Sequence, residues 1–190
     1  MIEAVEGALW TRDLLERVRV SAAPELDNIV VAVDPPASSG PNADACGIVG
    51  VGASGRMAYV LADETVRGVS PAAWAGCAVS LAQRLGASEI LVEANQGGEM
   101  ARYAIETVSD RLPVRLVRAM SNKRARATPV AALYEHGRVH HAGRFRALED
   151  EMCAFGGDGF HASPDRMDAL VWAVWALLLD RSDAGRVRRV

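Results

Sequence analysis

Two apolar runs in this sequence each end on an acidic residue where the chain must turn away. Residues 29–33 are followed by Asp34 and then by two prolines, and residues 90–92 are followed by Glu93 and soon by two glycines. Short apolar runs bounded by such breakers are typical of buried strands in a parallel sheet. Because ligands of open α/β sheets bind beyond the carboxyl ends of parallel strands, we expect Asp34 and Glu93 to lie side by side.

The order of the remaining elements predicts an α/β fold with a mixed sheet. Turn residues 54–56 join two further apolar runs into a hairpin, and Ser70-Pro71 is typical of a helix start. The expected elements are strands at 28–34, 45–53, 57–65, 88–94 and 112–120, and helices at 71–85, 97–111, 145–154 and from Ser163 as N-cap onward. In this βββ-α-β-α-β-α order the first three strands are antiparallel, and the last two run parallel to the first.

Length and composition limit the class of protein. A chain of 190 residues fits one domain with a hydrophobic core, and the apolar stretch 169–179 is too short to span a bilayer. The first residues carry acids and lack the basic head of a signal peptide, so we expect a cytoplasmic protein. The three cysteines form no CxxC pair, which argues against a disulfide framework and against a zinc site.

The net charge of −3 hides one strongly basic segment. Residues 111–146 hold nine Lys or Arg and one acid, whereas the rest of the chain holds 12 basic and 23 acidic residues. A basic segment on an otherwise acidic protein indicates a polyanion partner. A solvated arginine-rich surface would explain the same pattern equally well.

A third acidic position lies in the stretch SPDRMDALVWA near the end of the sequence. Asp165 and Asp168 are three residues apart, so they share one face of the first turn of a predicted helix. Acids favour helix N-termini, which explains Asp165 well, but Asp168 lies further in, beside an apolar face. Each acid alone is more often structural than functional. Two at strand ends and one opening the last helix together indicate a metal site.

These motifs resemble those of a known family. The stretches VVAVDPP, ILVEANQGG and SPDRMDALVWA are similar to the three acidic motifs of the nuclease domain of large terminase subunits, and LYEHGRVHHAG to the segment before the last helix. Such proteins package DNA in tailed phages and in related gene transfer agents. The resemblance extends from about Trp10 to Asp180. It implies an RNase H-like mixed sheet, with three antiparallel strands followed by parallel strands and with helices on both faces.

The resemblance also implies roles for individual residues. Asp34, Glu93 and Asp168 match the family's metal ligands, and Asp165 matches an auxiliary catalytic position. The implied cofactors are two Mg²⁺ or Mn²⁺ ions, which carboxylate oxygens prefer over zinc. The basic residues expected to hold the DNA backbone are Lys123, Arg124, Arg126 and Arg138.

The resemblance further implies a domain plan and a set of partners. A full terminase also has an ATPase half, but no GxxxxGK[ST] motif occurs in this chain. We therefore expect residues 1–26 to be the remnant of an interdomain linker, 27–182 the nuclease domain, and 183–190 a flexible basic tail. The expected partners are double-stranded DNA, a terminase ATPase domain, the small terminase subunit and the portal protein, in the cytoplasm of a prokaryotic host cell and away from membranes.

The activity implied is metal-dependent endonucleolytic cleavage of double-stranded DNA, with little sequence specificity, during genome packaging. Two alternatives stay open. The first is a catalytically silent RNase H-like module that binds DNA or a packaging partner. The second is another RNase H-like nuclease, such as a junction resolvase.

Overall fold

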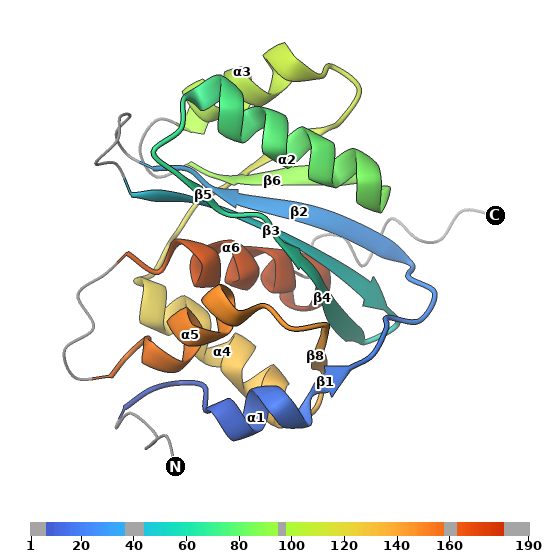
Figure 1. Ribbon diagram of the computed structural model, residues 1–190, viewed down its shortest axis with the longest axis vertical. Helices are drawn as coiled ribbons and strands as arrows, with labels where there is room; N and C mark the ends of the chain where they lie inside the picture. The colour runs from blue at the N-terminus through green and yellow to red at the C-terminus, as the bar shows by residue number, and fades with distance from the viewer. Residues whose placement is uncertain (1–6, 37–43, 95–97, 158–162, 181–190) are drawn as a thin grey trace.

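A mixed sheet lies at the centre of the protein, whose computed structural model describes residues 7–36, 44–94, 98–157 and 163–180 (Figure 1). Within these residues seven strands follow one another across the sheet in the order β1-β8-β4-β3-β2-β6-β7, and β5 pairs with β3. The strands are β1 (Arg19–Val20), β2 (Asn28–Asp34), β3 (Ala45–Ser54), β4 (Met57–Asp63), β5 (Val66–Arg67), β6 (Glu89–Glu93), β7 (Val114–Val117) and β8 (Val139–Ala142).

The predicted strand directions are confirmed. β2, β3 and β4 form an antiparallel meander, and β6 and β7 run parallel to β2 on its other side. The hairpin between β3 and β4 turns at Gly55, whose φ of 57° lies in the left-handed region that glycine adopts most easily. β8 and β1 extend the sheet beyond β4, both in parallel pairing.

Helices cover both faces of the sheet, as predicted (Figure 1). The helices α2 and α3 lie on one face, and α1, α4, α5 and α6 lie on the other. Their bounds are α1 (Arg12–Arg17), α2 (Pro71–Leu85), α3 (Gly98–Val108), α4 (Lys123–Glu135), α5 (Arg146–Ala154) and α6 (Asp165–Val174), which continues as the π-helical turn η1 (Trp175–Leu179). No helix in the described part of the chain is long and apolar enough to cross a membrane.

Capping explains where two of these helices begin and end. The Ser70 hydroxyl accepts the amide hydrogen of Ala73 at 3.3 Å, Pro71 opens α2, and Gly86 ends it with a φ of 67°, all as predicted. The prediction that Ser163 caps the last helix is wrong, because α6 has no side-chain cap. The Ser163 hydroxyl donates instead to the buried carboxylate of Asp165.

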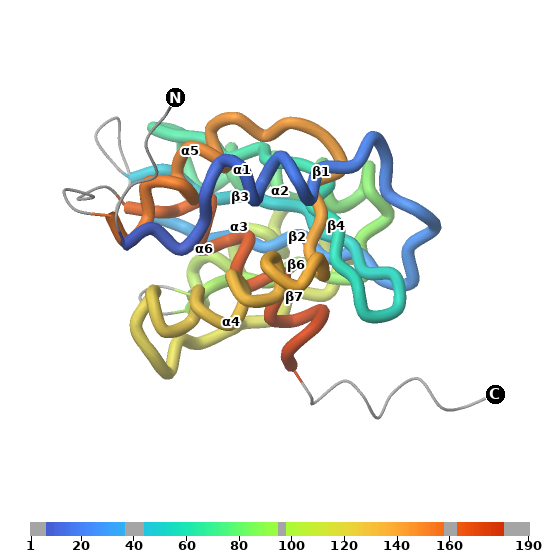
Figure 2. Tube along the Cα trace, turned by 90° about the horizontal axis from the view of Figure 1, so that it is seen from below, coloured from blue at the N-terminus to red at the C-terminus, as the bar shows by residue number. Residues whose placement is uncertain are grey.

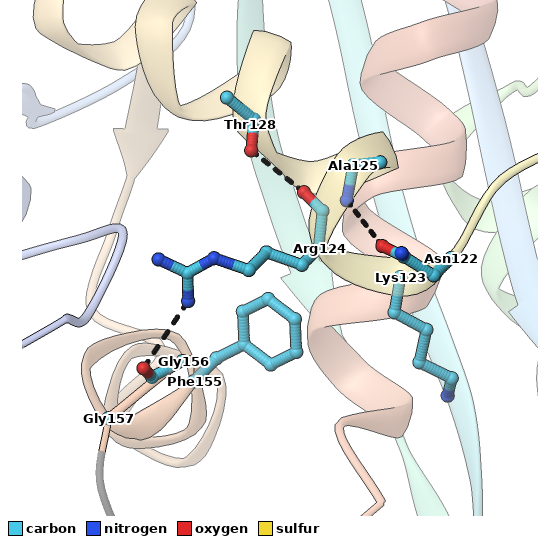
Figure 3. Close-up of a pocket in the computed structure, with 8 residues that line it drawn as sticks. All are labelled: Asn122, Lys123, Arg124, Ala125, Thr128, Phe155, Gly156 and Gly157. Atoms are coloured by element: carbon cyan, nitrogen blue, oxygen red, sulfur yellow. Dashed lines mark hydrogen bonds between the residues drawn. The ribbon is translucent and has the colours of Figure 1, made fainter.

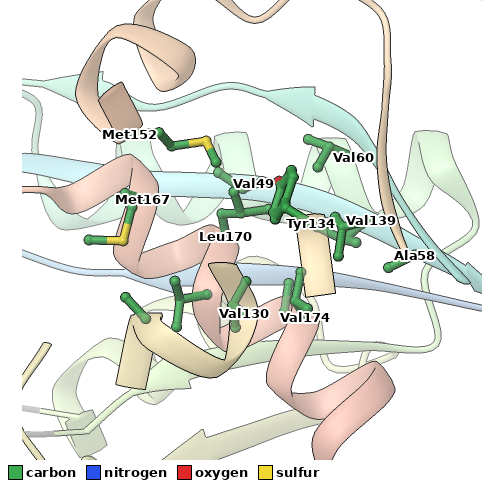
Figure 4. Close-up of a cluster of buried hydrophobic side chains, with 14 of the residues drawn as sticks. Val49, Ala58, Val60, Val130, Tyr134, Val139, Met152, Met167, Leu170 and Val174 are labelled. Atoms are coloured by element: carbon green, nitrogen blue, oxygen red, sulfur yellow. The ribbon is translucent and has the colours of Figure 1, made fainter. Parts of the chain in front are cut away.

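Two hydrophobic cores fill the space between the sheet and its helices. The core beneath α4, α5 and α6 includes Val49, Tyr134, Met152 and Leu170 (Figure 4). The core beneath α2 and α3 includes Trp74, Leu81, Ile90 and Ile105. Every strand that carries an acid of the predicted site is therefore packed from both sides, which fixes the position of its last residue.

The N-terminal segment packs into the first of these cores. Trp10 is 1% exposed, Leu15 is fully buried, and β1 pairs in parallel with β8. Figure 2 shows α1 lying beside α5, in agreement with their contacts. Residues 10–20 of the segment that we expected to be a linker remnant thus contribute to the core of the domain. The expected basic tail at 183–190 lies outside the described residues.

A buried polar network joins this segment to α4 and α5. The Tyr134 hydroxyl lies 2.9 Å from Nε2 of His141, and Nδ1 of His141 lies 3.0 Å from the Glu149 carboxylate. Arg19 donates to both oxygens of that carboxylate, at 2.8 and 3.1 Å. Burial alone would raise the pKa of Glu149, but its hydrogen bonds with His141, Arg19 and the Phe145 amide lower that pKa well below its ordinary value.

Candidate metal centre

The ends of β2 and β6 place the first two predicted acids next to each other. The two strands are parallel neighbours in which Val33 pairs with Val92, so Asp34 and Glu93 follow at the same edge of the sheet. Asp34 is half-buried and Glu93 is 5% exposed. The juxtaposition inferred from the two apolar runs is therefore present in the structure.

The first turns of α6 supply the third acid. This helix packs across β3 and β2, and the Asp168 side chain on it is fully buried. Asp34, Glu93 and Asp168 each offer a carboxylate oxygen, and these three oxygens all lie within 4.8 Å of one another. We refer to these three residues as the acid cluster.

Electrostatic repulsion within the acid cluster affects the protonation of Asp34. Its pKa is raised well above the ordinary value, first by burial and then by the negative charges of Glu93 and Asp168. A buried group of carboxylates at this spacing needs cations to remain ionised. The hard oxygen donors and the absence of sulfur or imidazole from the cluster fit a divalent ion such as Mg²⁺ or Mn²⁺.

Arg126 is one cation that the chain itself provides. Its Nη2 donates to Asp168 Oδ1 at 2.8 Å and lies 3.6 Å from Glu93 Oε1. The guanidinium carbon lies 4.5 Å from the centre of the Trp172 ring, a cation–π distance, and the whole residue is 4% exposed. Arg126 was expected to hold DNA, but it lies behind the acid cluster, against two of its carboxylates.

Lys123 provides a second cation from the other side of Asp168. Its Nζ forms an ion pair with Asp168 Oδ2, while 42% of the side chain stays exposed. Burial lowers the pKa of Lys123, but the charge of Asp168 and the hydrogen bond to it outweigh burial and raise the pKa overall. Both cations come from α4, three residues apart and hence on one face of the helix.

The start of α4 also borders a cavity of about 770 Å³ (Figure 3). Its other wall is formed by Phe155, Gly156 and Gly157. Arg124 extends across it and donates to the backbone oxygen of Gly156 at 3.3 Å, whereas Lys123 points away from Arg124. The cavity therefore combines the positive dipole end of a helix, capped by the Asn122 side chain, with two basic residues, and this combination suits an anion.

Two further predicted residues are not members of the acid cluster. Arg138 donates to the backbone oxygen of Arg56 beside the hairpin turn, at the opposite end of β3 from Gly47 and Asp34, which is roughly 20 Å of extended chain. Asp165 is 5% exposed and accepts the Ser163 hydroxyl, and burial raises its pKa. Among the described residues, the group of acids close enough together to hold a metal contains Asp168 and not Asp165.

Gly47 is a residue of the site that the sequence reasoning missed. It pairs with Asp34 across β2 and β3, and a Cβ atom there would collide with the backbone of Asp165. Only glycine lets α6 approach β3 this closely. A glycine inside an apolar strand pattern is a known sign of close backbone approach, so this signal was available in the sequence.

The acidic edge of a mixed sheet with this strand order defines the class of protein as RNase H-like. A family model described as the terminase RNaseH-like domain matches residues 31–177. The chain belongs to that family. This confirms the resemblance drawn from the three acidic motifs.

Solved structures of terminase nuclease domains share the fold. The human cytomegalovirus terminase nuclease domain, soaked with Mn and bound to an inhibitor, aligns with a TM-score of 0.67 at 17% identity, over 96% of this chain and 100% of that one. A mutant gp2c of the large terminase subunit from bacteriophage Sf6, with calcium, aligns with a TM-score of 0.64 at 17% identity, over 88% and 98%. A search of curated protein sequences finds no match to this chain.

Proposed function

We propose that this domain is a metal-dependent endonuclease that cuts double-stranded DNA with little sequence specificity during packaging into a phage or gene-transfer-agent head. The observation that carries the proposal is the acid cluster, in which three carboxylate oxygens from β2, β6 and α6 lie within 4.8 Å of one another. Membership of the terminase family and the Mn or calcium present in related nuclease domains support it.

The residues that would hold the metal are Asp34, Glu93 and Asp168. Two Mg²⁺ or Mn²⁺ ions there would activate a water and stabilise the departing 3′ oxygen, leaving 5′-phosphate and 3′-hydroxyl ends. Asp165, one turn before Asp168 on α6, would orient a water or a metal ligand without binding the metal itself.

The chain's own basic residues would bind and orient the DNA. Arg124 and Lys123 border the cavity at the start of α4, where they would contact phosphates without reading bases. Arg126 is buried against Glu93 and Asp168, so it would hold these ligands in place. Arg138, at the far end of β3, would contact only DNA that extends well beyond the cleaved bond.

The proposal includes the family's setting. The domain would act in the cytoplasm of a prokaryotic host cell, with a terminase ATPase domain, the small terminase subunit and the portal protein as partners. Its low sequence specificity would suit an enzyme that cuts a concatemer wherever the head has filled.

The test is cleavage by an Asp34→Asn variant, with Asp27→Asn as the matched control. Asp27 is the same residue type, but it bonds to the Gly55 amide at 2.6 Å at the opposite end of β2. With plasmid and Mn²⁺, Asp34→Asn should lose cleavage and Asp27→Asn should keep it. In chelator, Asp34→Asn should be as stable as wild type or more so, because one repelling charge is gone.

The outcomes separate the alternatives. Near-wild-type cutting by Asp34→Asn would contradict the proposal. A wild-type domain that binds duplex DNA but never cuts it would be the silent module. Cutting restricted to four-way junctions would indicate a resolvase.

A further inference from the structure

The only lysine in the chain lies at the acid cluster. Of the 21 basic residues in the sequence, Lys123 is the single lysine and all others are arginine. Its Nζ pairs with Asp168 Oδ2. An arginine head is a planar, rigid fork suited to permanent bidentate contacts, whereas a lysine head is a compact point charge on a flexible stem. The residue type at position 123 is therefore the one best suited to a contact that is made and broken.

The two cations on Asp168 are held very differently. Arg126 is enclosed by Glu93, Asp168 and the Trp172 ring, and its backbone oxygen accepts Trp175 Nε1 at 2.8 Å. The Lys123 side chain is 42% exposed, and within the described part of the chain Asp168 is the only carboxylate with which it forms an ion pair. Arg126 can leave only if the core opens, but Lys123 can leave by rotating its stem.

Asp168 cannot keep both cations and also bind a metal. Arg126 contacts Oδ1 and Lys123 contacts Oδ2, so each carboxylate oxygen already has a positive neighbour. A divalent ion on the buried Oδ2 would place two positive charges next to Nζ, and the repulsion is strong at such a short distance. The less constrained cation, Lys123, is the one that would be expelled.

A place for the expelled side chain lies next to it. Lys123 is the first residue of α4 and lines the cavity at the start of that helix, together with Arg124 (Figure 3). There its ammonium would lie near the N-terminus of α4, where the helix dipole also favours a phosphate.

We propose that Lys123 is an exchangeable cation: it neutralises Asp168 while the metal is absent, and metal binding releases it to contact a phosphate of the DNA backbone. The inference rests on the proposed function, because it takes a divalent ion and a nucleic acid as the two ligands. It makes DNA binding depend on metal through one side chain.

Chemical labelling of wild-type protein tests the release directly. An amine-reactive ester is added in chelator and in Ca²⁺, and modification at Lys123 is compared by mass spectrometry with modification of the chain's α-amino group as an internal reference. Relative labelling of Lys123 should rise several-fold in Ca²⁺. Calorimetry on the same samples reports whether the ion binds.

Two variants test the competition. Lys123→Met should bind Ca²⁺ about tenfold more tightly or better, because a repelling charge is removed. Arg124→Met is the matched control, since its guanidinium contacts backbone oxygens and no acid of the cluster, and its Ca²⁺ affinity should stay unchanged. In Ca²⁺, Lys123→Met should also lower the salt slope of duplex binding by about 0.9, with no effect in chelator.

The possible results are distinct. If Ca²⁺ binds but Lys123 stays protected, or if Lys123→Met weakens Ca²⁺ binding, the lysine is a fixed part of the site and the inference is overturned. If calorimetry detects no binding of Ca²⁺ or Mn²⁺, the proposed function itself fails. The labelling experiment needs no variant, so it decides the matter even if Lys123→Met does not fold.

Discussion

Replacing Gly47 with alanine should disable the metal centre without changing any of its carboxylates. Gly47 lies on β3 opposite Asp34, at the point where the first turn of α6 crosses the sheet. An alanine Cβ would lie 2.6 Å from the carbonyl carbon of Asp165, closer still to its oxygen, and 3.3 Å from the Cβ of Ala169. Both obstacles belong to one helix, and the first is backbone, so no side chain can rotate away.

The size of the effect follows from these distances. Ordinary contact begins near 3.4 Å, so α6 would have to move by about 1 Å, and overpacking of this kind costs about 1–3 kcal/mol of unfolding free energy. Asp168 would move with the helix, while Asp34 and Glu93 would stay on their strands. A misplacement of about 1 Å can cost about 100-fold in rate, and we expect a loss of that order in cleavage.

The control is Gly52→Ala on the same strand. There the added Cβ would meet Leu26 Cδ1 at 2.5 Å, the end of a flexible side chain far from the acid cluster. Urea unfolding, Ca²⁺ calorimetry and plasmid cleavage are measured for both variants. Gly52→Ala should lose stability at most, whereas Gly47→Ala should also lose metal affinity and cleavage. Unchanged metal affinity in a folded Gly47→Ala protein would refute the argument that this close approach positions Asp168.

Two further predictions concern α6 and its neighbour α5. Asp168→Asn should remove cleavage at any Mg²⁺ or Mn²⁺ concentration, while Asp165→Asn should keep partial activity that raised metal restores, and the opposite result in a metal titration would show that the two roles are exchanged. Glu151 accepts the Met167 amide hydrogen at 2.8 Å, and burial raises its pKa from 4.5 to about 7. Because the folded state then holds this proton more tightly, the wild type should lose stability as the pH rises from about 4.5 to about 7. Glu151→Gln should remove this pH dependence and raise the unfolding free energy by at most about 3 kcal/mol over wild type above pH 7. If urea unfolding gives the same difference between the two proteins at pH 5 and at pH 8, the prediction is contradicted.

The parts of the site that sequence predicts best are those written in local patterns. An apolar run, an acid and a breaker place Asp34 and Glu93 at strand ends, and parallel pairing brings them together. The start and the end of α2 were equally predictable, from Ser70-Pro71 and from Gly86. In each instance a few adjacent residues determine the outcome.

The basic segment was harder to interpret because its structure depends on distant packing. The sequence analysis predicts no helix where α4 lies, although Asn122 caps its start and Ala127, Val130 and Tyr134 follow at helical spacing; Pro129 lies within the helix, a residue that normally disfavours a helix interior. Whether a basic residue on that helix faces solvent or carboxylates is decided by how α4 meets α6. Arg126 was expected to hold the DNA backbone, but it is 4% exposed and lies against Glu93 and Asp168.

The network of Arg19, Glu149, His141 and Tyr134 gives the domain a mechanical property. Tyr134 and Lys123 lie near opposite ends of α4, so the helix that carries the acid cluster's cations is anchored at its far end to the N-terminal segment. Pulling Arg19 away would leave the buried Glu149 carboxylate without one of its charged partners, at a cost of up to about 3–5 kcal/mol. A pulling force on the chain before β1 would thus be transmitted to α4 through Glu149, His141 and Tyr134. Tension strong enough to break that anchor would loosen the helix that neutralises Asp168.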